Sequence, residues 1–121
     1  MKEKLTLFGN DFVKSVRDNT LFVLEGIISG HMKSAIDKDM FKKIKSLSSE
    51  EQDLIRDLAY RMVDLTLHNM LFMFENNDHW EIISKEDKSD IAEISDGLAG
   101  ELYTDDGWIK KFSEYQISRG L

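Results

Sequence analysis

Asp64 and His68 are the first side chains in this sequence whose types and spacing could bind a ligand together. They stand four residues apart, so on a helix they lie on one face, one turn from each other. Zinc accepts a carboxylate and an imidazole, but a protein site needs three or more such ligands. The paired Glu-x-x-His motifs of di-iron bundles and the His-Glu-x-x-His motif are both missing. Asp64 and His68 are therefore minor candidates, and the sequence predicts no metal and no cofactor.

A polar stripe offers another interpretation of the same pair. Asp53, Asp57, Arg61, Asp64 and His68 recur at spacings of four, four, three and four residues. Arg61 is placed for intrahelical ion pairs with the two aspartates on either side of it, each worth about 0.2–0.5 kcal/mol. We favour this interpretation, in which the stripe faces solvent or an interface.

Residues 94–112 (ISDGLAGELYTDDGWIKKF) look like a second site, because they combine four acids with three glycines. A calcium loop would need Asp first, Asp or Asn third and fifth, Gly sixth and an acid twelfth. None of the three glycines fits the sixth position of that template. The spacing of Ile94, Leu98 and Leu102 instead predicts one helix running through Gly97 and Gly100.

Two details of this joint follow from the helical interpretation. Glycine inside a helix costs about 1 kcal/mol relative to alanine, so we expect a close approach to a neighbouring helix or a kink near Gly97. Thr104 is expected to cap the next helix, with Asp105 and Asp106 in its first turn. Trp80, which follows His79 at another joint, is expected to anchor the core rather than to form a binding corner.

The elements that must position these residues are all helices. Apolar residues recur at helical spacing in every long segment, and the chain has no proline to interrupt them. Ser48 and Glu51 form a capping box at the start of a long helix of about 49–75. Because apolar residues of 65–74 cover most of its circumference, this helix is expected to be central and buried. Residues 78–86 could be helical or extended. We predict one all-α domain over 1–121, a compact bundle of four to six helices.

Charge and composition restrict the function. Residues 1–47 hold nine Lys/Arg against six Asp/Glu, whereas residues 48–121 hold seven against seventeen. Such a surface repels nucleic acid and anionic membranes and attracts a basic partner. The chain has no cysteine and no apolar run approaching 18 residues, and its start does not resemble a signal peptide, so we expect a cytoplasmic protein. The nucleophile elbow and the phosphate loops are missing too, which argues against an enzyme.

The leading hypothesis is a non-catalytic protein that acts by protein–protein contact. Its size, acidity and cysteine-free helical build resemble, in a general way, small bacterial immunity proteins, which cover the basic active surface of a toxin. That resemblance implies an immunity-type inhibitor of a basic toxin or nuclease. The alternatives are a bundle with a small-molecule or metal pocket beside Asp64 and His68, and a structural homodimer subunit, suggested by the apolar crowding near residues 70–74. The predicted partner-binding residues are Trp80, Gly97, Gly100, Glu101, Tyr103, Asp105 and Asp106.

Overall fold

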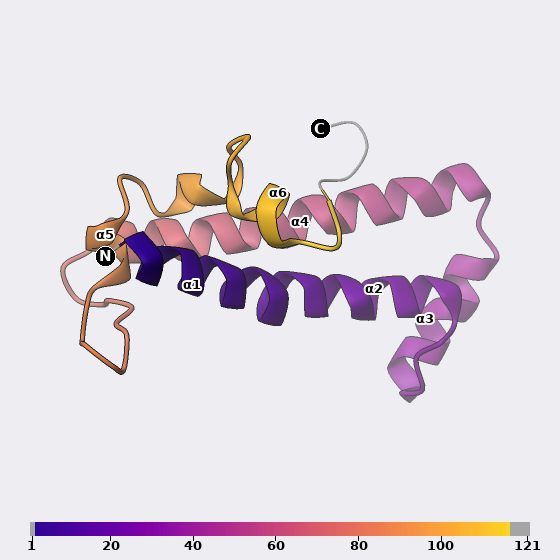
Figure 1. Ribbon diagram of the computed structural model, residues 1–121. Helices are drawn as coiled ribbons and strands as arrows, with labels where there is room; N and C mark the ends of the chain where they lie inside the picture. Colours follow the sequence, from indigo (N-terminus) through magenta and orange to yellow (C-terminus); the bar gives the residue numbers. More distant parts are fainter. Residues whose placement is uncertain (1, 117–121) are drawn as a thin grey trace.

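The structure, a computed structural model that describes residues 2–116, confirms the all-α bundle (Figure 1). Two long helical rods lie side by side and run in opposite directions, and the short C-terminal elements lie along the second half of α4. The elements, in chain order, are α1 (Lys2–Phe12), the π-helix η1 (Val13–Asp18), α2 (Asn19–Ser29), α3 (Ala35–Lys45), α4 (Ser49–Glu75), α5 (Ile91–Ile94), the 3₁₀-helix η2 (Ala99–Leu102) and α6 (Trp108–Phe112).

The first rod is α1, η1 and α2, which follow one another without a break. It ends at Gly30, whose φ of 83° is the left-handed conformation that glycine adopts without a steric penalty. Ser34 then caps α3, its hydroxyl accepting a hydrogen bond from the Asp37 amide. The turn between Gly30 and Ser34 brings α3 across the end of the bundle where α2 stops and α4 begins (Figure 1).

The second rod is α4, which spans the predicted residues. Its capping box is formed: the Glu51 amide donates to the Ser48 hydroxyl at 3.1 Å, and the Ser48 amide donates to the Glu51 carboxylate at 2.9 Å. The expectation that residues 65–74 are covered on nearly all sides needs correction, because Phe72 and Met73 remain about half exposed. Among the described residues, no helix is both long and apolar enough to span a membrane.

The core lies between the first rod, the second half of α4 and the C-terminal segments. Its buried members come from every one of these parts: Phe12, Val13, Leu67, Leu71, Ile91, Leu98, Ala99, Leu102, Trp108 and Ile109. The first half of α4 is also held to α2 by a polar group. Arg56 and Tyr60 both donate to the Glu25 carboxylate, at 3.0–3.1 Å and 2.9 Å. Burial, and next the bond to Glu25, raise the pKa of Tyr60 to about 12.

The joint at 94–112 differs from the predicted helix–cap–helix. The helix α5 stops at Ile94, and η2 begins only at Ala99, so one helix does not run through Gly97 and Gly100. Leu98 and Leu102 are still fully buried. The predicted Thr104 cap is wrong as well: Gly107 holds the N-cap position of α6, with no side-chain cap.

Residues 78–86, for which the sequence allowed two conformations, form no helix. They belong to a loop that Asn77 organises, its side-chain oxygen accepting hydrogen bonds from the amides of His79 and Trp80. An isolated antiparallel bridge between Ile83 and Asp90 then brings the chain back to α5.

The close helix approach that the sequence placed at Gly97 and Gly100 occurs at Gly9. A Cβ added to Gly9 would lie 2.4 Å from the indole of the buried Trp108. At Gly97 and Gly100 an added Cβ would meet no atom within 4 Å.

We therefore expect Gly9→Ala to lower the free energy of unfolding by about 1–2 kcal/mol, since overpacking outweighs the gain in helix propensity. The matched change Gly97→Ala should stay within about 0.5 kcal/mol of wild type. Urea denaturation followed by circular dichroism measures both. A Gly9→Ala protein more stable than wild type would show that the indole can move aside.

Candidate functional site

Asp64 is bound by Arg17 in the interior of the protein. Arg17 is fully buried in η1, and Asp64 is 1% exposed. The Arg17 guanidinium donates two hydrogen bonds to the Asp64 carboxylate, from Nε to Oδ1 at 2.6 Å and from Nη2 to Oδ2 at 3.3 Å. The prediction that Asp64 belongs to a stripe facing solvent or an interface is therefore wrong, and its carboxylate is paired with a protein cation.

The same guanidinium holds the segment that follows α6. Its Nη1 donates to the Ser113 hydroxyl at 2.7 Å and to the carbonyl of Tyr115. Asp18, the next residue of η1, accepts from the Ser113 hydroxyl and from the Glu114 amide. Arg17 and Asp18 thus join three parts of the chain that are far apart in sequence.

His68 packs between two aromatic rings. Its ring centroid lies 5.7 Å from that of Tyr103 and 6.1 Å from that of Phe72. Its Nδ1 is buried without a hydrogen-bond partner. The Tyr103 hydroxyl donates to the Asp64 carbonyl at 2.7 Å, and burial raises the pKa of Tyr103. Within residues 2–116, no three His, Asp or Glu side chains are grouped so that they could hold a metal ion.

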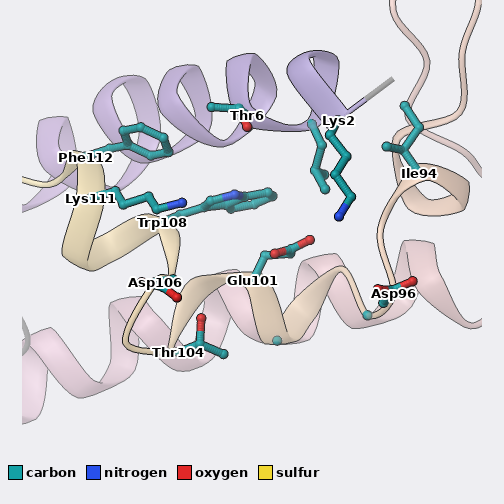
Figure 2. A pocket seen from close by; sticks show the side chains of 13 residues that line it. Lys2, Thr6, Ile94, Asp96, Glu101, Thr104, Asp106, Trp108, Lys111 and Phe112 are labelled. Atoms are coloured by element: carbon teal, nitrogen blue, oxygen red, sulfur yellow. The ribbon is translucent and has the colours of Figure 1, made fainter.

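A cleft of about 490 Å³ lies between the start of α1 and residues 94–112 (Figure 2). Gly97, Gly100, Glu101 and Asp106 of the predicted set all line it. The bare glycines leave this cleft open, because nothing packs where their side chains would be. The Glu101 carboxylate is fixed by a 2.7 Å hydrogen bond from the Ser95 hydroxyl, and Figure 2 shows it below the indole of Trp108.

A second cleft, of about 460 Å³, surrounds Trp80 at the end of α4. Trp80 does not anchor the core as expected; it is 67% exposed, and the core tryptophan is Trp108. None of the described residues that line this cleft is Lys or Arg. Five carry carboxylates: Glu75, Asp78, Glu81, Asp90 and Glu93.

A third cleft joins these two around α5. It shares Glu81, Asp90 and Glu93 with the cleft beside Trp80, which we call the Trp80 cleft. It shares Lys2 and Ile94 with the cleft beside Gly97 and Gly100, which we call the glycine cleft. We call the described residues that line the three clefts the acidic end. Its charged members are eight carboxylates and three lysines: Glu75, Asp78, Glu81, Asp90, Glu93, Asp96, Glu101, Asp106, Lys2, Lys88 and Lys111.

Within the acidic end, Asp90 and Glu93 are close enough to Glu81 to affect its ionisation. A hydrogen bond with Asp90, followed by the negative charges of Asp90 and Glu93, raises the pKa of Glu81. Like charges disfavour ionisation at this position, so a cation placed here would relieve the repulsion.

The structure divides the predicted partner-binding residues into two groups. Trp80, together with the four residues that line the glycine cleft, belongs to the acidic end. Tyr103 and Asp105 line a smaller cleft of about 280 Å³ with residues of α6. Sequence reasoning missed the buried Arg17, although one signal existed: Val13, Arg17 and Leu21 recur every four residues, which puts the arginine within an apolar row.

Comparison of the chain with family models, with curated proteins and with solved structures finds no match.

Loss of the Arg17 guanidinium should remove a large part of the free energy of unfolding. We expect Arg17→Met to lower the free energy of unfolding by about 3–5 kcal/mol, because it leaves the Asp64 carboxylate buried and unpaired. The double variant Arg17→Met/Asp64→Leu should recover a large part of that loss, since neither charge remains. Arg61→Met, at an exposed arginine of the same helix as Asp64, is the control and should change stability by less than about 0.5 kcal/mol. In urea denaturation, a loss in the double variant equal to the sum of the losses in Arg17→Met and in Asp64→Leu alone would contradict a direct coupling.

Proposed function

We propose that this protein is a non-catalytic binding protein whose acidic end contacts a basic protein partner. The observation that carries the proposal is the Trp80 cleft, where five carboxylates and an exposed tryptophan surround one opening. Carboxylates accelerate the encounter with a basic surface, and an aromatic side chain supplies local affinity once the surfaces meet.

The chemistry of the cleft suits lysine and arginine side chains. An indole binds a guanidinium or an ammonium group over its face, and carboxylates accept charge-assisted hydrogen bonds from the same groups. The carboxylates are not grouped as a metal site among the described residues. A volume of about 460 Å³ also offers room for long side chains.

An immunity-type role is the more specific form of this proposal. The net charge of −7 over 121 residues and the helical build support an inhibitor that covers the basic active surface of a toxin or nuclease. A bacterial source and a cytoplasmic location belong to the same proposal. The alternative pocket beside Asp64 and His68 is less favoured, because Arg17 occupies the Asp64 carboxylate.

Trp80→Ala should weaken binding of the partner about thirtyfold, the effect of losing an aromatic residue that contributes about 2 kcal/mol to an interface. The partner is first captured from a lysate of the native host, and its affinity is then measured by titration calorimetry. Phe22→Ala is the matched control, since Phe22 is 61% exposed but lies on α2, away from the acidic end. A captured protein that is acidic, or whose affinity does not fall as salt is raised, would refute the proposal.

Binding should also depend on pH in a defined direction. A partner cation favours the ionised form of Glu81, so binding lowers the raised pKa of this carboxyl group. Affinity is then greatest above that pKa and falls as the pH is lowered through it. Glu81→Gln should flatten the dependence measured between about pH 7 and pH 4, whereas Glu50→Gln, at the far end of α4, should leave it unchanged. Equal curves for wild type and Glu81→Gln would remove Glu81 from the interface.

A further inference from the structure

One face of α4 is uncovered along most of its length and carries apolar side chains, with Arg61 and Asn69 between them. Leu54, Leu58, Leu65 and Phe72 follow one another at steps of four, seven and seven residues, so they form one row on the helix. Met62 and Met73 lie beside this row, and all of these side chains except the half-buried Leu65 are 45–68% exposed. We call these six residues the outer face.

The outer face is distinct from the site proposed for the basic partner. Between Leu54 and Met73 the helix has two acids, of which Asp64 is buried against Arg17 and Asp57 is half-buried. The exposed charge in this stretch is that of Arg61. Arg61 lies within the same face, and a surface with an exposed arginine and no exposed carboxylate offers nothing to attract a basic protein.

We propose that the outer face binds a second copy of this chain, the two α4 helices packing antiparallel about a twofold axis near the middle of the face. Area is the first argument. Taking roughly 200 Å² for the full surface of a residue of this size, the five exposed members leave on the order of 500 Å² open. An apolar area of this size is at the upper end of the patches that monomeric proteins expose. The polar residues between the apolar ones add to the area that would be buried and bring it toward the ~800 Å² per partner of a stable interface.

Charge is the second argument, and it selects the antiparallel arrangement. The acidic end lies at the C-terminal end of α4, and the lysine-rich α3 lies at the other end (Figure 1). Residues 31–51, which include the first acids of α4, carry five lysines against four acids. A parallel pair would bring two acidic ends together, whereas an antiparallel pair places each acidic end beside the partner's α3. A twofold axis makes the same face complementary to itself.

Sedimentation equilibrium of the purified chain over a range of concentrations tests the dimer. Wild type should reach the mass of a dimer, and Leu54→Gln/Leu58→Gln should raise the dissociation constant at least about tenfold. Leu7→Gln/Phe22→Gln is the matched control, because these side chains are 59% and 61% exposed on α1 and α2. Circular dichroism checks that both variants stay folded. A wild-type monomer at every concentration, or equal loss of dimer in both variants, overturns the proposal.

Engineered cysteines test the arrangement, because the chain has none of its own. Near the twofold axis, Met62→Cys in the two copies should form a disulfide, which needs Cα atoms about 4.4–6.8 Å apart. Leu54→Cys should not cross-link, because antiparallel helices would hold its two copies about 25 Å apart. Any other pattern, including cross-linking at both positions as in a parallel pair, overturns the antiparallel dimer. Amide protection of α4 that arises only with the basic partner would assign the outer face to that partner instead.

Discussion

The structure depends above all on one buried charge, the Arg17 guanidinium, whose hydrogen-bond acceptors come from separate parts of the chain. The Arg17 guanidinium has no access to solvent, so its donors need protein acceptors. Asp64 supplies two, and Ser113 and Tyr115 supply others from the segment after α6. Such a group adds little stability compared with an apolar core of the same size. What it does is to fix the relative positions of the first rod, α4 and the C-terminal segment, because any shift would leave a charge unpaired.

The π-helix around Arg17 has a function in this arrangement. A widened turn keeps residues four apart on one face, so Val13, Arg17 and Leu21 all point into the interior with no exposure. Gly9, one turn earlier, lets the first rod meet the Trp108 indole at the same time. The short elements α5, η2 and α6 then close over the core without regular packing. The clefts of the acidic end lie where these elements meet α1, the end of α4 and the loop that follows it, so the proposed binding surface is a result of how the C-terminal third covers the rods.

The two proposed surfaces rely on different forces and lie on different parts of the molecule. At the acidic end, electrostatic attraction would select a basic partner, with Trp80 as the main contact. On the outer face of α4, burial of leucine, methionine and phenylalanine would drive association of two copies. In an antiparallel dimer the two acidic ends lie at opposite ends of the α4 pair, each beside the α3 of the other copy.

The sequence by itself determined the helical class, the limits of α4, the capping box at Ser48 and Glu51 and the acidic charge, because each depends on neighbours within a few residues. The structure, not the sequence, brings five of the seven residues predicted to bind a partner to one end of the molecule. Only the tertiary structure decided which tryptophan is buried, which glycine permits close packing and that Asp64 pairs with Arg17, 47 residues away. The same helical spacing suits a solvated stripe and a buried ion pair. What distinguishes them is the surface that packs against the helix, and that surface comes from remote parts of the chain.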